Sequence, residues 1–183
     1  MKETDLINDI ISGDERAFKV LVDHYASMVF RVIMSFGLSR EDAEDISQEV
    51  FIEVYNNIKK FRKESGISTW MYRIAINKSI NYNRKSKRLI WNRQDSDDIS
   101  AIDKSIFEQS SEDNLISDEQ RRVLYSTIDK LPKNQRIAFT LNKLDELSYR
   151  EISEIMSISV SSVESLLHRA KMNLQKSLLG FFE

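Results

Sequence analysis

The sequence predicts an all-α fold of two small helical domains joined by an acidic flexible linker, the C-terminal domain being a helix-turn-helix. Apolar residues recur at helical spacing through most of the 183 residues, and only four glycines and one proline are available to interrupt them. Acidic residues without strong periodicity crowd the middle of the chain. We therefore expect domains over residues 1–92 and 118–183, with a linker over 93–117.

The first domain is expected to contain four helices. A short helix should end near Ser12-Gly13-Asp14, and a long one should stop at Gly37, because glycine terminates helices. Ser39 can cap a third helix, and the loop over residues 61–68 should separate it from a fourth helix that begins near Thr69. The apolar residues that mark the first three helices are Leu6, Ile7, Ile10 and Ile11, then Phe18, Leu21, Val22, Tyr25, Val29, Val32, Ile33 and Phe36, then Ala43, Ile46, Val50, Val54 and Ile58.

The second domain is expected to open with two further helices. One carries Val123, Leu124, Ile128 and Leu131 and should end at Pro132. The next carries Ile137, Ala138, Leu141 and Leu144. The linker before them is expected to hold at most a helical turn around residues 101–107.

A helix-turn-helix is predicted near the C-terminal end. Ser148 and Glu151 have the spacing of a capping box, and a serine turn at 157–159 separates two helices. The buried faces are predicted to be Ile152, Ile155 and Met156 in one helix and Val163, Leu167, Ala170 and Leu174 in the other. The opposite face of the second helix carries Ser161, Ser162, Ser165, His168 and Arg169. This pattern fits a DNA-reading helix, and it also fits an ordinary surface hairpin.

Charge is segregated along the chain although the net charge is only −2. Residues 62–88 hold eight cations and one acid, and residues 94–119 hold nine acids and one cation. The segregation indicates a cationic surface followed by a solvated acidic linker, as a nucleic-acid binder would have. A merely solvated face would have the same composition.

Several function classes are disfavoured. The chain has no cysteine, so disulfides, thiolate zinc sites and a cysteine nucleophile are excluded. The two histidines, His24 and His168, lie far apart, and there is no glycine-rich phosphate loop. We expect no catalytic residue, no metal ion and no cofactor. No apolar run approaches the ~20 residues of a membrane span, and Met1-Lys2-Glu3-Thr4-Asp5 lacks a signal-peptide pattern, so we expect a cytoplasmic protein without membrane insertion.

Carboxylates share one face of the third helix. Asp42, Asp45 and Glu49 fall together, with Gln48 and Glu53 beside them, opposite the apolar residues of that helix. No neighbouring base or nucleophile supports catalysis. The face is either solubilising or a docking surface for a cationic protein.

Aromatic residues and cations alternate from Ser68 to Arg88. Rings can stack on unpaired bases while cations hold phosphates, a combination suited to single-stranded DNA. Asn77 can offer a donor and an acceptor to one base edge. Alternatively, Trp70, Ile74 and Ile76 are simply core, and we expect Trp70 to be at least partly buried.

The ordered motifs of this chain resemble the extracytoplasmic-function (ECF) class of the sigma-70 family of bacterial RNA polymerase sigma factors. The resemblance covers nearly the whole chain except the acidic linker. It rests on residues 13–18, 42–51, 68–77, 131–132, 147–152 and 167–171.

The resemblance implies a role for each surface. The acidic helix would bind the clamp coiled coil of core polymerase through Asp42, Asp45, Gln48 and Glu49. Melted −10 DNA would be bound by Phe61, Arg62, Ser65, Ser68, Trp70, Tyr72, Arg73, Asn77, Asn81, Arg84, Lys85, Lys87 and Arg88. Duplex −35 DNA would be bound by Asn142, Ser161, Ser162, Glu164, Ser165, His168, Arg169 and Lys171. Further implied partners are the polymerase flap and an anti-sigma factor, and the linker would run through polymerase channels.

Three residues depart from the family pattern. Glu164 and Leu166 stand where cations are common in the recognition helix, and Asn142 stands where an arginine is frequent. Glu164 would repel phosphate, although it could accept from a cytosine amino group. The preferred −35 sequence is therefore expected to differ from the familiar one.

Together these patterns predict a sigma factor that confers promoter specificity on RNA polymerase and is not an enzyme. A conventional helix-turn-helix regulator, binding duplex DNA as a dimer without polymerase, is the alternative. That alternative gives no reason for the pattern between Trp70 and Arg88.

Overall fold

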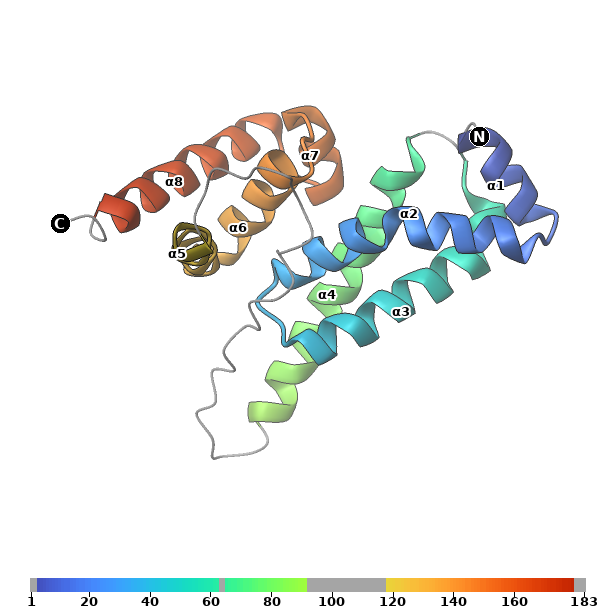
Figure 1. Cartoon of the computed structure of the whole chain (residues 1–183), viewed down its shortest axis with the longest axis horizontal. Helices are drawn as coiled ribbons and strands as arrows, with labels where there is room; N and C mark the ends of the chain where they lie inside the picture. Colours follow the sequence, from blue (N-terminus) through green and yellow to red (C-terminus); the bar gives the residue numbers. More distant parts are fainter. Residues whose placement is uncertain (1–2, 63–64, 92–117, 180–183) are drawn as a thin grey trace. The chain divides into compact units, whose positions relative to one another are not determined.

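The computed structural model describes residues 3–62, 65–91 and 118–179, with side chains placed for these residues except 86–91 and 118–122. Every regular element in the described ranges is helical, which confirms the predicted all-α fold (Figure 1). The possible turn at 101–107 and the linker lie outside the described residues.

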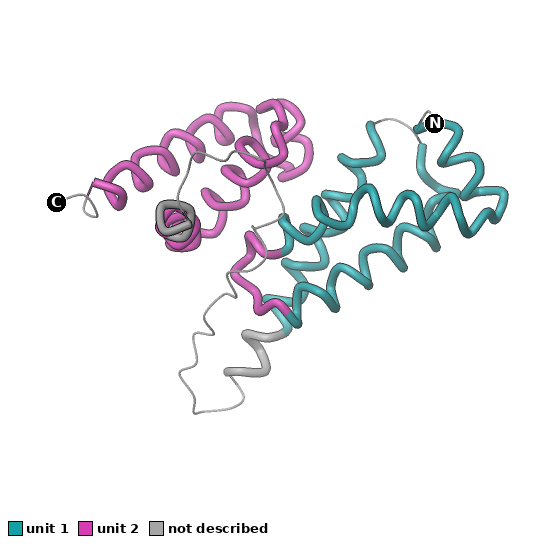
Figure 2. The backbone as a smooth tube through the Cα atoms, viewed as in Figure 1, with its two compact units in different colours: residues 1–33, 41–99 teal, residues 34–40, 100–183 magenta. Residues whose placement is uncertain are grey.

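The chain divides into two compact units. One comprises residues 1–33 and 41–99, and the other comprises residues 34–40 and 100–183 (Figure 2). The second unit thus includes a short turn from the first half of the sequence. The domain limits expected from the sequence remain a prediction.

The described residues of the first unit form four α-helices and a short 3₁₀ turn. They are α1 (Glu3–Ile11), α2 (Glu15–Met34), α3 (Arg40–Asn57), η1 (Ile58–Lys60) and α4 (Ile67–Trp91). The predicted apolar stripes form its core, where Leu21, Val29 and Val50 are fully buried. Asp14 caps α2 by accepting the N–H of Arg16 at 2.8 Å.

A long-range contact fixes the start of α4. The Glu3 carboxylate accepts the backbone N–H of Ile67 at 3.1 Å, satisfying one of the donors that a helix N-terminus leaves unpaired. The contact joins α1 to the helix that carries the candidate DNA-binding residues.

The second unit contains α5 (Asp118–Asp129), α6 (Lys133–Phe139), η3 (Thr140–Leu144), α7 (Tyr149–Met156) and α8 (Val160–Leu179). The helix expected through Leu144 changes to a wider π-helical turn after Phe139, where the Asp145 N–H bonds the Thr140 carbonyl five residues back. The predicted apolar faces of α7 and α8 are confirmed for Ile152, Ile155, Val163, Leu167, Ala170 and Leu174, which are buried. Met156, predicted on the same face of α7, is half-buried.

A buried cation, which the sequence patterns did not single out, holds residues 34–40 in the second unit. Arg136 is buried; its Nε donates to the Ser35 carbonyl at 2.7 Å and its Nη1 donates to the Asp129 carbonyl. Gly37 has φ +73°, and a Cβ there would lie 2.7 Å from Arg136 Nη2. The positive φ therefore favours glycine, and a larger residue would also have to displace the guanidinium.

Candidate nucleic-acid interface

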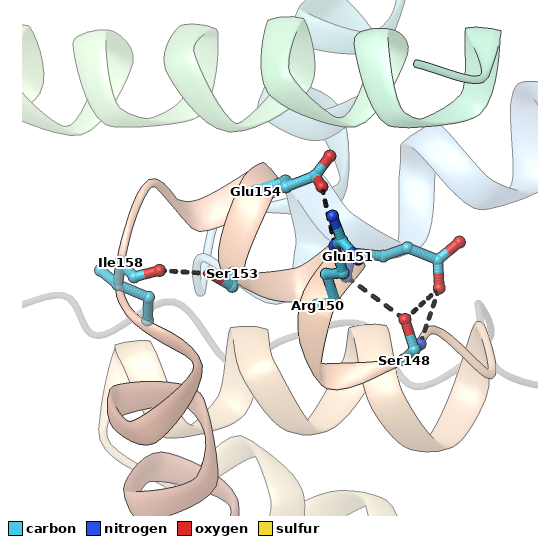
Figure 3. A network of polar contacts seen from close by, with 6 residues as sticks. All are labelled: Ser148, Arg150, Glu151, Ser153, Glu154 and Ile158. Atoms are coloured by element: carbon cyan, nitrogen blue, oxygen red, sulfur yellow. Dashed lines mark hydrogen bonds and ion pairs between the residues drawn. The ribbon is translucent and has the colours of Figure 1, made fainter. Parts of the chain in front are cut away.

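The predicted capping box fixes the start of α7 (Figure 3). The Glu151 carboxylate accepts the Ser148 N–H at 2.8 Å and its hydroxyl at 2.6 Å, while Ser148 Oγ accepts the Glu151 N–H at 3.3 Å. These hydrogen bonds lower the pKa of Glu151. At the other end, Ser157 adopts a left-handed conformation (φ 55°), and the Ser153 hydroxyl donates to the Ile158 carbonyl at 2.6 Å. The turn into α8 is thus held by its own serines.

The start of α8 depends on Ser159, which the sequence pattern places in the turn. Its hydroxyl accepts the Ser162 N–H at 3.2 Å and lies 3.0 Å and 2.8 Å from the hydroxyls of Ser161 and Ser162. A serine directly before an apolar-periodic segment is a usable cap signal. The exposed side of α8 carries the predicted −35 candidates Ser161, Ser162, Glu164, Ser165, His168, Arg169 and Lys171.

An open groove of about 1120 Å³ brings part of this set together with Asn142 of η3. The candidates that line it are Asn142, Glu164, Ser165, His168, Arg169 and Lys171, whereas Ser161 and Ser162 lie outside it. Asn142 is half-buried, and its amide donates to the Leu147 carbonyl at 2.9 Å. Part of its hydrogen-bonding capacity therefore supports the loop that precedes α7.

One exposed face of α4 collects the central −10 candidates. Asn77, Asn81 and Arg84 are exposed at helical spacing, and Arg84 donates to the Asn81 amide oxygen at 3.3 Å. Ile80, an apolar residue outside the predicted pattern of aromatics and cations, lies on the same face with 46% of its surface exposed. Lys85 and Arg62 are also exposed. The side chains of Lys87 and Arg88 lie outside the described residues.

The aromatic residues of the segment divide into two groups. Trp70 is half-buried, as expected, and its ring centroid lies 5.2 Å from that of Phe61. Tyr72 is only 2% exposed, which contradicts its selection as a DNA contact. It falls on the side of α4 that faces the core with Ala75 and Ser79, so its ring is withdrawn from the surface. Ser65, Ser68 and Arg73 are half-buried.

The acidic face of α3 is exposed at Asp45, Gln48 and Glu49, opposite buried Ala43, Ile46 and Val50. Two of its carboxylates are engaged by α4. The Tyr82 hydroxyl donates to Asp42, and Lys78 Nζ lies 3.3 Å from Glu49 Oε2. Pattern reasoning missed both contacts because their partners are 40 and 29 residues apart.

The contact between Tyr82 and Asp42 should be visible in a titration. Hydrogen bonding to Asp42, with partial burial, raises the pKa of Tyr82 to about 12. Asp42→Asn should return the pKa toward 10.0, because the anionic acceptor is lost. A phenol whose pKa is higher in the folded state adds stability below pH 10, and that stability is lost as pH rises through about 12.

The measurement is the tyrosinate absorbance of the wild type, Asp42→Asn and Tyr82→Phe as the pH is raised. Subtracting the Tyr82→Phe curve isolates the absorbance change of Tyr82 from that of the other five tyrosines. Superimposable wild-type and Asp42→Asn curves would show that Asp42 does not govern this phenol.

Comparison with known proteins identifies two family regions along the chain. Residues 21–89 match the family description of Sigma-70 region 2, and residues 121–174 match that of Sigma-70 region 4. The ECF RNA polymerase sigma-E factor of Haemophilus influenzae is 34% identical over 181 residues, covering 94% of this chain and 93% of the relative. The chain belongs to the ECF class of sigma-70 family RNA polymerase sigma factors. Sigma factors are transcription initiation factors rather than enzymes.

Other relatives agree with this assignment. The ECF RNA polymerase sigma-E factor of Escherichia coli K12 is 38% identical over 174 residues, covering 91% of this sigma factor and 88% of the relative. Among solved structures, sigma factor RpoE in complex with the anti-sigma factor NepR from Bartonella quintana has a TM-score of 0.73 at 21% identity, covering 88% and 96% of the two chains. CnrH in complex with the cytosolic domain of CnrY has a TM-score of 0.67 at 24% identity, covering 96% of each. These two structures support the fold.

None of the helices described combines the length and apolarity needed to cross a membrane. The placed side chains include no group of three or more histidine, aspartate or glutamate residues arranged to hold a metal ion.

Proposed function

We propose that this sigma factor binds core polymerase through α3, engages melted −10 DNA through α4 and reads −35 DNA through α8. The observation that carries the proposal is that two helices of the first unit expose side chains of different chemistry. Carboxylates are exposed on α3 at Asp45 and Glu49, while Asn77, Asn81 and Arg84 are exposed on α4. One surface suits a cationic protein, and the other suits bases and phosphates. The catalysis of RNA synthesis would belong to the polymerase.

The remaining assignments follow from family membership and from the exposed residues. We infer domains at 1–92 and 118–183 with a linker between them, and action in the cytoplasm, where core polymerase works. An anti-sigma partner is inferred because a solved structure with a similar fold is described as a complex with one. The polymerase contacts would be the clamp coiled coil and the flap.

The assignment of α8 to −35 DNA is tested by two substitutions with different expected results. Arg169→Ala should weaken the binding of all −35 sequences to the same extent. It should also reduce the slope of log affinity against log salt by about one unit, because a cation that contacts a phosphate is removed. Glu164→Arg should strengthen binding generally and shift the preferred base, because an acid at the groove becomes a base-reading cation.

The assay is a −35 library bound by holoenzyme at two salt concentrations. Lys176→Ala is a matched control, because Lys176 is an exposed cation of α8 outside the groove. If Glu164→Arg leaves both affinity and base preference unaltered, this helix does not enter the DNA groove at Glu164.

A further inference from the structure

Lys78 connects the two surfaces of the first unit. It follows Asn77 directly in α4, yet its ammonium lies 3.0 Å from Glu53 Oε2 and 3.3 Å from Glu49 Oε2, both on α3. The lysine side chain is 23% exposed, whereas those of Glu49 and Glu53 are 65% and 43% exposed. A cation adjacent to the DNA-facing side of α4 is thus held by the carboxylates of the helix assigned to polymerase.

We propose that Lys78 is a phosphate-binding residue that Glu49 and Glu53 hold against α3 in the free protein, and that polymerase binding at Glu49 releases it to promoter DNA. The proposal rests on the proposed function, in which Glu49 faces a cationic surface of polymerase. The proposal goes further, because it couples the binding of polymerase to the binding of promoter DNA.

The charges make this exchange favourable. Partial burial lowers the pKa of Lys78, but its hydrogen bonds to Glu53 and Glu49 outweigh that effect and raise the pKa, so the ammonium is charged at neutral pH. A cation of the polymerase beside Glu49 would compete for the same carboxylate and repel the ammonium. Ion pairs with carboxylates this exposed contribute little to stability, so breaking them costs little.

Once released, the Lys78 side chain can reach the DNA-facing side of α4. Lys78 and Asn81 are three residues apart in α4 and are neighbours on the helix surface. A lysine ammonium is a compact charge on a flexible four-carbon stem, so rotation of the stem can carry it from α3 toward the face that bears Asn77 and Asn81. A strand bound along that face offers phosphates to receive it.

The first test compares full-length Lys78→Met, Lys78→Arg and the control Lys19→Met, an exposed lysine of α2. With core polymerase, Lys78→Met should bind at least as tightly as wild type, because a competitor for Glu49 is gone. For its promoter complex, the slope of log affinity against log salt should be shallower by roughly 0.7 to 0.9 units, the change expected for the loss of one phosphate contact. Lys78→Arg should keep the wild-type slope, and Lys19→Met should change neither quantity.

The second test addresses the holding of Lys78 in the free protein. Glu53→Gln removes one of the two carboxylates and should raise the affinity of free sigma factor for a single-stranded −10 oligonucleotide severalfold. The double variant Glu53→Gln, Lys78→Met should lose that gain. An unchanged oligonucleotide affinity in Glu53→Gln would overturn the holding of Lys78 by α3.

Two further outcomes would overturn the proposal while leaving the proposed function standing. If Lys78→Met binds polymerase more weakly and the salt slope is unchanged, the lysine only joins α3 to α4. If Lys78→Met matches wild type in both measurements, the lysine has no part in either event. If the wild-type chain fails to bind core polymerase, that result instead contradicts the proposed function itself.

Discussion

Replacing Asp45 and Glu49 together by lysine is expected to weaken core-polymerase binding about a hundredfold while the fold stays intact. Both side chains are exposed on α3, and the residues that hold this helix in the core, Ala43 and Val50, are untouched. Placing like charges across an interface costs several kcal/mol, and about 3 kcal/mol corresponds to a hundredfold change in the dissociation constant.

The measurement is the dissociation constant for core polymerase, with helix content recorded for each variant. Glu15→Lys with Asp23→Lys is a matched control, because it makes the same charge change at exposed positions of α2. If the Asp45/Glu49 variant and the wild type bind polymerase with equal affinity, α3 is not part of the polymerase interface.

Asn77→Ala is expected to impair promoter opening and to relax base preference at one −10 position, while polymerase binding persists. Asn77 is exposed on α4, where its amide can donate to and accept from the edge of one base. Losing a paired contact of this kind costs about 1–3 kcal/mol of discrimination between bases.

The assay is open-complex formation on a −10 library, with Asn134→Ala, an exposed asparagine of α6, as the control. Asn77→Asp should also change the preference, because it keeps the shape and removes the donor. If the Asn77→Ala variant opens promoters at the wild-type rate and with the wild-type preference, Asn77 reads no base.

Features that are local in sequence were predictable. The buried faces of α7 and α8 follow from apolar residues three and four positions apart, because that spacing returns side chains to one side of a helix. The capping box of Ser148 and Glu151 was predictable because both partners belong to one helical turn.

Features that depend on how helices pack were not predictable. Lys78 looked like one cation among eight, and only the packing of α4 on α3 pairs it with Glu49 and Glu53. Tyr72 was selected for DNA because aromatics and cations alternate around it, but its position on α4 turns the ring into the core. Arg136 gave no sequence signal because its acceptors are backbone carbonyls, which every residue type provides.

The central claim, that this chain gives core polymerase its promoter specificity, is tested most directly by transcription from a randomised promoter library with core polymerase alone and with the chain added. We predict that transcripts appear only when the chain is present and that the selected templates share two short sequence blocks, at −10 and −35. Palindromic duplex binding by the chain alone, with no transcripts that depend on it, would contradict the account and favour a conventional helix-turn-helix regulator.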